Sequence, residues 1–135
     1  MQCRRPTLFA ALVLAVSALA GCGSDDPYVP AKGHTVSLRL DEYRVLPQRV
    51  TAPAGRITLV ARNTGRLTHN LAVVQFARPL GDEQERQYAR SRTAHPGETV
   101  STTVTLKPGK YRVVCTIANH DNLGQYGELK VQSPR

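Results

Sequence analysis

The stretch "GKYRVVCTIANHDNLGQYGELKV", residues 109–131, has the pattern of two strands joined by a polar loop. In its first half, Tyr111, Val113 and Cys115 occupy alternate positions, so a strand places their side chains on one face. We expect this face to point into the protein. His120 follows in the loop, five residues after Cys115. The stretch therefore predicts a β-fold in which a thiol and an imidazole meet at the end of a strand.

Short alternating runs recur along the rest of the chain. Apolar residues occupy every second position in three of them, at Val36, Leu38 and Leu40, at Ile57, Leu59 and Ala61, and at Val100, Val104 and Leu106 with Thr102 between them. Turn sequences containing Pro, Gly or both separate the runs, at 52–55, 63–65, 95–98 and 107–109. Several short alternating strands with such turns predict an all-β protein, a Greek-key β-sandwich or barrel.

One segment departs from the strand pattern. The sequence "GDEQERQYARS", residues 81–91, is polar, rich in helix-forming residues and free of Gly and Pro in its interior. It favours a short surface helix or an ordered loop between two strands.

The N-terminus has the layout of an export signal. In "MQCRRPTLFAALVLAVSALAGC", Arg4 and Arg5 precede an apolar run over about residues 8–19, and small residues follow. The run is shorter than the roughly 20 residues that a membrane-spanning helix needs. The segment therefore predicts export and cleavage.

Two cleavage sites compete in this segment. Residues 18–20, Ala-Leu-Ala, fit an ordinary secretory signal, which would give a soluble secreted or periplasmic protein. Residues 19–22, Leu-Ala-Gly-Cys, resemble the bacterial lipoprotein box, in which Cys22 is acylated and becomes the first residue. On the second hypothesis, which we favour, 1–21 is the signal peptide and the protein is extracytoplasmic and anchored to the membrane by lipid.

The lipoprotein hypothesis divides the mature chain into two parts. Residues 22–33, rich in Gly, Pro, Ser and Asp, predict a flexible tether, and residues 34–135 form the folded domain. Loss of the signal removes two arginines and lowers the formal charge from +8 to +6. This charge favours solubility and attraction to an anionic membrane surface or an acidic partner. Nucleic acid is not an expected partner, because no run of Lys and Arg interleaved with aromatic residues is present.

The cysteines number three, and the two near the N-terminus are accounted for. Cys3 leaves with the signal and Cys22 carries the lipid, so Cys115 has no partner for a disulfide. An exported protein exposes a single thiol to oxidation unless the thiol is buried or bound to a metal. Cys115 is therefore either an inert core residue or a metal ligand.

Four side chains carry the chemistry of the candidate site: His69, Cys115, His120 and Gln125. Cys115, His120 and Gln125 come from one loop, and His69, in "NTGRLTHNLAVV", stands where a loop meets an apolar strand. A thiolate with two imidazoles and a weak axial donor suits copper in a trigonal site. Catalysis by Cys115 as a nucleophile has less support, because no orienting group or oxyanion site is marked, and we expect no enzyme.

Two segments give the sequence a specific resemblance. Residues 63–70, N-x-G-x-x-x-H-N, and residues 115–125, C-x4-H-x4-Q, resemble the copper loops of the cupredoxins, the family of plastocyanin, amicyanin and azurin. The resemblance implies one type 1 (blue) copper ion with His69, Cys115 and His120 as equatorial ligands. It also implies that Asn70 and Thr116 help to hold the two ligand loops together.

Gln125 departs from the most common family pattern, which has Met at this position. The only methionine is Met1, which leaves with the signal, so no thioether ligand is available in the mature chain. The amide oxygen of Gln125 is the expected axial donor, and this harder donor favours Cu(II) over Cu(I).

The expected function is one-electron transfer by a monomeric, membrane-anchored carrier. By the resemblance, a redox partner docks near His120, and Arg66 and Arg78 favour one with an acidic surface. Two alternatives use the same fold: an accessory protein that delivers copper to an extracytoplasmic oxidase, and a cupredoxin-like domain with a structural role only.

Overall fold

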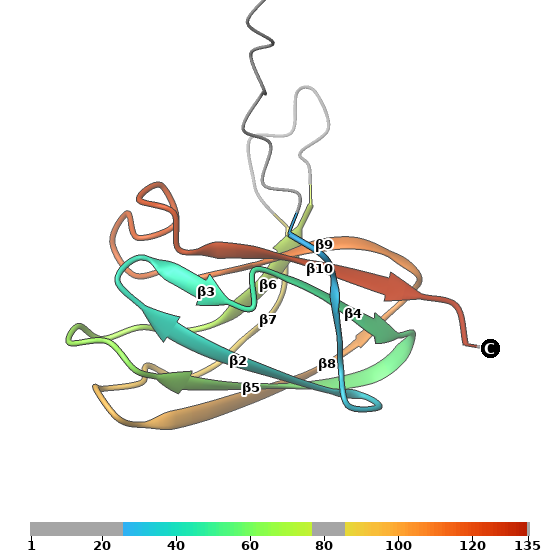
Figure 1. Ribbon diagram of the computed structural model, residues 1–135, viewed down its shortest axis with the longest axis horizontal. Helices are drawn as coiled ribbons and strands as arrows, with labels where there is room; N and C mark the ends of the chain where they lie inside the picture. Colours follow the sequence, from blue (N-terminus) through green and yellow to red (C-terminus); the bar gives the residue numbers. More distant parts are fainter. Residues whose placement is uncertain (1–25, 77–85, 135) are drawn as a thin grey trace, which may run out of the picture.

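The computed structural model describes residues 26–76 and 86–134, which fold into two packed β-sheets (Figure 1). The six-stranded sheet has the order β1 (Val29–Pro30), β4 (Arg49–Pro53), β10 (Tyr126–Gln132), β9 (Gly109–Val114), β6 (Ala72–Gln75) and β7 (Gln87–Arg90). The four-stranded sheet has the order β3 (Arg44–Leu46), β2 (Thr35–Asp41), β5 (Gly55–Asn63) and β8 (Thr99–Leu106). The predicted all-β sandwich is confirmed.

The chain crosses repeatedly between the sheets. Both sheets are mixed: β2 pairs with β5 and β4 with β10 in parallel, whereas β9 pairs with β10 and β5 with β8 antiparallel. Parallel neighbours cannot be joined by a hairpin, so the chain leaves one sheet and returns through the other. This topology brings loops from distant parts of the sequence to the same end of the sandwich.

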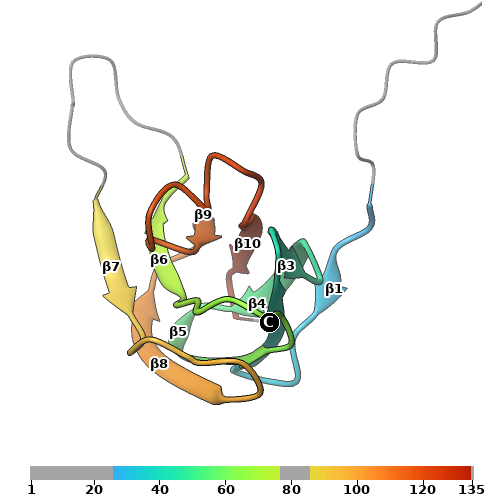
Figure 2. The ribbon, with the colours of Figure 1, turned by 90° about the vertical axis from the view of Figure 1, so that its left-hand side faces the viewer.

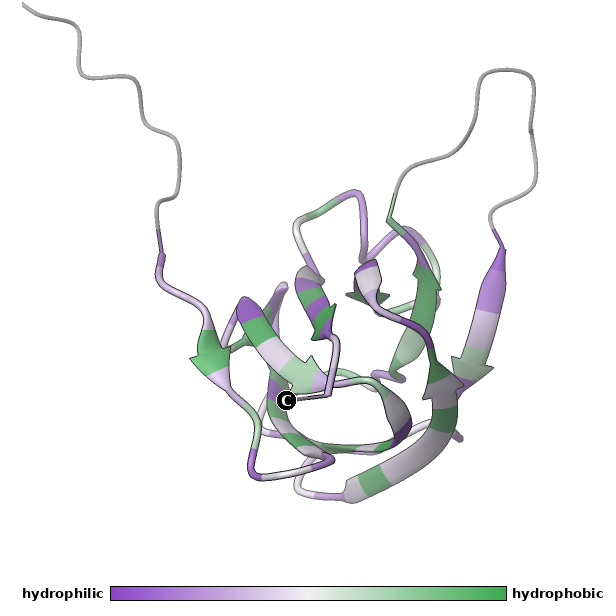
Figure 3. Cartoon of the chain, turned by 90° about the vertical axis from the view of Figure 1, so that its right-hand side faces the viewer, coloured by the Kyte–Doolittle hydropathy of each residue, from purple (hydrophilic) through white to green (hydrophobic). Residues whose placement is uncertain are grey.

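The core lies between the two sheets and follows the alternation of the sequence. In β2 and β5, the inward residues are buried and their neighbours are mostly exposed or half-buried, and the hydropathy alternates along the strands (Figure 3). The core contains all the inward residues predicted for these two strands: Val36, Leu38, Leu40, Ile57, Leu59 and Ala61. In β9, Val113 joins the same core and Tyr111 packs against it, so this face points inward as expected.

The prediction for residues 81–91 is corrected where the structure describes them. Gln87–Arg90 form strand β7, not a helix, and pair with β6 through Ala72↔Arg90 and Val73↔Ala89. Pairing with a neighbouring strand outweighs the helix propensity of single residues. Residues 81–85 lie outside the described part of the chain.

The expected tether overlaps with the fold. Val29–Pro30 form β1, which pairs with Val50 and Thr51 of β4, so order begins before residue 34. The predicted signal peptide and Cys22 lie outside the described residues. In the parts that the structure describes, no helix has the length and apolar character needed to cross a bilayer.

Three connections meet at one end of the sandwich, on the left in Figure 1. They are the turn between β2 and β3, the loop from β5 to β6, and the loop from β9 to β10. Figure 2 looks onto this end. The candidate site residues lie here.

Truncation of the core should reveal how much of the stability depends on it. Leu59 is fully buried in β5, so Leu59→Ala leaves a cavity and should lower the free energy of unfolding by about 2–5 kcal/mol in denaturant titrations. Leu123→Ala, at a 52% exposed position, is the matched control and should change it by less than about 0.5 kcal/mol. Equal effects of the two substitutions would contradict the described core.

Candidate metal centre

The loop between β9 and β10 is closed by its own backbone. Cys115 N–H donates to the carbonyl of Gln125 over 3.1 Å, and Gln125 N–H donates to the carbonyl of His120 over 3.0 Å. Gly124 supplies a positive φ of 112° just before the chain enters β10. The three residues spaced five apart are therefore held together by hydrogen bonds rather than spread along an open loop.

The loop after β5 is organised around the buried side chain of Asn63. Its amide nitrogen donates to the carbonyls of Leu67, over 2.7 Å, and Ala94, over 2.9 Å, and its oxygen accepts from Gly65 N–H. His69 then exchanges two backbone hydrogen bonds with Ala94. The asparagine and glycine of the N-x-G-x-x-x-H-N motif thus shape the turn that delivers His69.

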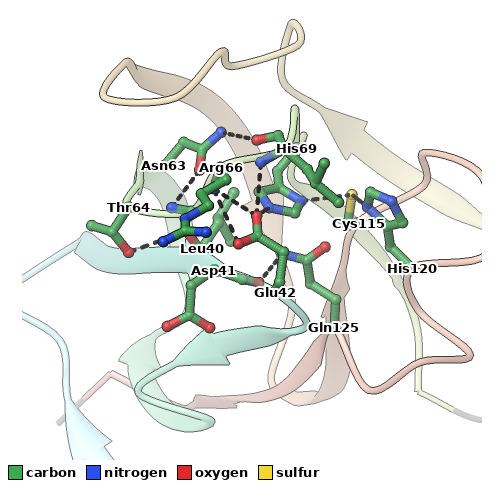
Figure 4. Close-up of polar contacts among 12 residues, drawn as sticks. Leu40, Asp41, Glu42, Asn63, Thr64, Arg66, His69, Cys115, His120 and Gln125 are labelled. Atoms are coloured by element: carbon green, nitrogen blue, oxygen red, sulfur yellow. Dashed lines mark hydrogen bonds and ion pairs between the residues drawn. The ribbon is translucent and has the colours of Figure 1, made fainter.

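The two loops bring His69, Cys115 and His120 together in the interior (Figure 4). Cys115 Sγ lies 3.6 Å from His120 Nδ1 and 4.0 Å from His69 Nδ1, and all three donor atoms lie within 4.8 Å of one another. Among the His, Cys, Asp and Glu side chains of the described residues, these three form the group that could hold a metal ion. His69 and Cys115 are fully buried, whereas His120 keeps 8% exposure and forms the solvent edge.

Gln125, from the same loop, is the fourth residue that the sequence predicts as a ligand. Its side chain is fully buried, and its Nε2 donates to the carbonyl of Asp41 over 2.7 Å. A carbonyl only accepts, so the amide nitrogen must face Asp41 and the oxygen must face the other way. Gln125 Oε1 has no hydrogen-bond partner, an arrangement that is rare for a buried polar atom and that a bound cation would resolve.

The thiol of Cys115 is shielded from solvent. Burial raises the pKa of Cys115, while hydrogen bonds from the backbone N–H groups of Asn70 and Ile117 oppose the rise. Such a thiol stays protonated in the absence of a metal, and a bound metal ion would displace its proton.

Asn70 and Thr116 connect the two loops directly. Asn70 Nδ2 donates to Thr116 Oγ1, and Thr116 N–H donates to Asn70 Oδ1, both over 2.8 Å. These are the residues that the family resemblance marked for this purpose. Each follows a candidate ligand in sequence, so the pair fixes the separation of His69 and Cys115.

The turn between β2 and β3 reaches the site as well, which the sequence analysis missed. Glu42 Oε1 lies 2.9 Å from His69 Nε2, and the Tyr43 ring lies 5.0 Å from the His120 ring. Glu42 also accepts from backbone N–H groups, chiefly that of Leu67, which lowers its pKa to about 2. The sequence contains one hint of this role, the acidic pair Asp41 and Glu42 directly after the alternating run that ends at Leu40. Two adjacent acidic residues do not have the spacing of a metal-binding motif.

The donor set fits a soft or borderline transition metal. A thiol and two imidazoles within 4.8 Å of one another match the three equatorial donors of trigonal copper sites, in which the axial ligand is weak. His34 and His95, which are exposed, take no part. An all-β sandwich with this cluster at one end is the arrangement of a metal-binding protein.

Comparison with known proteins identifies the family. Residues 7–125 match the family described as the cupredoxin-like domain, and the chain belongs to it. The structure resembles reduced auracyanin from Roseiflexus castenholzii, with a TM-score of 0.63 and 23% identity over 74% of this chain and 98% of that one. The resemblance to the cupredoxins is confirmed.

Two further solved structures have the same fold. Auracyanin A, a blue copper protein from Chloroflexus aurantiacus, gives a TM-score of 0.59 at 23% identity, over 77% of this chain and 100% of that one. Auracyanin B gives 0.59 at 21% identity, over 80% and 92%. A search of curated protein sequences gave no match. The family and the His-Cys-His cluster together fit one type 1 copper ion.

The link between the loops can be tested on the metal-free protein. Asn70→Ala removes both 2.8 Å hydrogen bonds and should lower the free energy of unfolding by about 1–3 kcal/mol, because Thr116 N–H loses its acceptor. Thr116→Ala removes only one of the two bonds and should cost less in the same denaturant titration. A larger loss for Thr116→Ala would contradict the described pairing.

Proposed function

We propose that the protein is a one-electron carrier with a type 1 copper centre held by His69, Cys115, His120 and Gln125. The observation that carries the proposal is the cluster of three buried donors, and the buried, unpartnered oxygen of Gln125 supports the fourth ligand. When bound, copper supplies a Cu(II)/Cu(I) couple. The proposal assigns no catalytic residue.

The surroundings of the donors favour electron transfer over the release of copper to another protein. Four backbone or side-chain hydrogen bonds close the loop and join it to the His69 loop, so the donors lie where the fold puts them. A site held in this way changes shape little between oxidation states, which keeps the reorganisation cost of electron transfer low. A protein that hands copper to an apo partner would gain from a looser loop.

We place the docking site of the redox partner around His120. This imidazole reaches the surface, and Leu67 and Leu123 on either ligand loop are 43% and 52% exposed. Arg66, also exposed, adds positive charge to the rim, which favours a partner with an acidic surface. Arg78 lies outside the described residues. The carrier acts as a monomer.

We further propose that the carrier works outside the cytoplasm, anchored through a lipid on Cys22. The support is the export-type N-terminus and the Leu-Ala-Gly-Cys sequence at 19–22. The fully buried thiol agrees with an oxidising compartment, because burial protects it before metal arrives. Mass spectrometry of the protein isolated from membranes should find acylation at Cys22; an unmodified N-terminus after residue 20 would contradict the anchor.

Copper binding can be tested by visible spectroscopy on the soluble domain. Titration with Cu(II) should give an intense thiolate-to-copper band that saturates at one equivalent, and Cys115→Ser should abolish it. Reversible one-electron voltammetry would then support a carrier. A stable Cu(I) complex that passes its metal to an apo oxidase but shows no such band would favour copper delivery, and a colourless protein of unchanged stability would favour a structural role.

A change of the axial donor should shift the reduction potential of the copper centre in a direction that the donor chemistry predicts. Gln125→Met replaces an amide oxygen by a softer sulfur, which favours Cu(I), so the potential should rise by about 60 mV or more, a tenfold change in relative affinity. Gln132→Met, at an exposed position at the far end of β10, is the control and should leave the potential unchanged. An equal or lower potential in Gln125→Met would exclude Gln125 as the axial ligand.

A further inference from the structure

Three consecutive residues, the last of β2 and the two of the turn after it, each touch a different side chain of the candidate centre. The Asp41 carbonyl holds Gln125 Nε2, Glu42 Oε1 lies 2.9 Å from His69 Nε2, and the Tyr43 ring packs against the His120 ring. Figure 4 shows Glu42 between the His69 loop and Gln125. These three residues therefore contact every candidate ligand other than Cys115.

Glu42 makes its contact with the candidate centre through a carboxylate, and this carboxylate is surrounded by donors. Its carboxylate accepts from Arg66 N–H over 2.9 and 3.0 Å and from Leu67 N–H over 2.9 Å. These hydrogen bonds from backbone N–H groups favour the ionised carboxylate. An ionised carboxylate only accepts hydrogen bonds, so His69 must donate to it through Nε2.

This donation determines the state of the other ring nitrogen. A neutral imidazole that carries its hydrogen on Nε2 has a lone pair at Nδ1. Nδ1 is the atom that faces Cys115. Because His69 is fully buried, solvent offers its ring no competing partner.

Gly65 provides a second, independent sign that the carboxylate is built into the site. A Cβ at this position would collide with the Glu42 carboxylate, so glycine leaves room for the carboxylate in its present position against the turn. The loop that delivers His69 is therefore shaped to receive a carboxylate.

We propose that Glu42 is a positioning residue that fixes the Nε2–H tautomer of His69 and, through its negative charge, lowers the reduction potential of the copper centre. The inference rests on the proposed function. A carboxylate hydrogen-bonded to a ligating histidine raises the basicity of the ligand. Its charge also stabilises the more positive oxidation state, Cu(II).

A purely structural role is the competing explanation, since Glu42 also caps two backbone N–H groups. Glu98 offers a matched control within the same protein. Its carboxylate accepts from His95 N–H and from Arg92, each over 2.9 Å, and its pKa is lowered by the same kind of bonds. No contact joins it to a candidate ligand among the described residues.

The test compares Glu42→Gln with Glu98→Gln in the whole chain loaded with copper. Glu42→Gln keeps the shape but removes the charge, and should shift the ratio of Cu(II) to Cu(I) affinity at least tenfold toward Cu(I), about 59 mV upward for one electron. Glu98→Gln should leave the potential unchanged. Equal potentials in Glu42→Gln and the unaltered protein would overturn the proposed tuning by charge.

A second measurement does not depend on copper. Nitrogen-15 NMR of the metal-free, unaltered protein should show His69 with a protonated Nε2 and a bare Nδ1. The opposite tautomer would overturn the positioning role even if Glu42→Gln fails to fold. If the tautomer is as expected but no blue centre forms, the positioning of His69 stands and the proposed electron carrier fails.

Discussion

Two hydrogen bonds between Asn70 and Thr116 hold the candidate centre together, because they join loops that no strand pairing connects directly at that point. Each residue follows a donor, His69 or Cys115, that sits where a loop meets a strand. The sheets fix where each loop starts, and this pair fixes how far apart the loops lie. The pairing of β6 with β9 ends at Ala72 and Val114, and the pair extends the connection to the residues that follow the two donors.

Much of the architecture could be predicted from the sequence because strands and closed loops have local signatures. The alternation in β2 and β5 predicted which residues face the core, and the five-residue spacing of Cys115, His120 and Gln125 predicted one loop. The other parts of the site depend on pairing between segments far apart in the chain. Glu42 meets His69 only because β2 lies parallel to β5, which single-strand patterns do not reveal.

The same reason explains the error near β7. Gln87–Arg90 have helix-forming composition, but β6 offers them an open edge with matching backbone groups. Similarly, Val29–Pro30 have the composition of a linker and become ordered by pairing with β4. In both cases a neighbour supplied by the tertiary fold determined the local structure, and neighbours of that kind leave no periodicity in the sequence.

The short strand β1 also affects how the protein interacts with other polypeptide chains. It is an edge strand of the six-stranded sheet and has only two residues. One of them, Pro30, has no backbone N–H that could donate a hydrogen bond. An edge so short and poor in donors gives another polypeptide few groups with which to extend the sheet. At a high local concentration of the protein, this edge therefore disfavours strand pairing between copies and the growth of fibrils along this side.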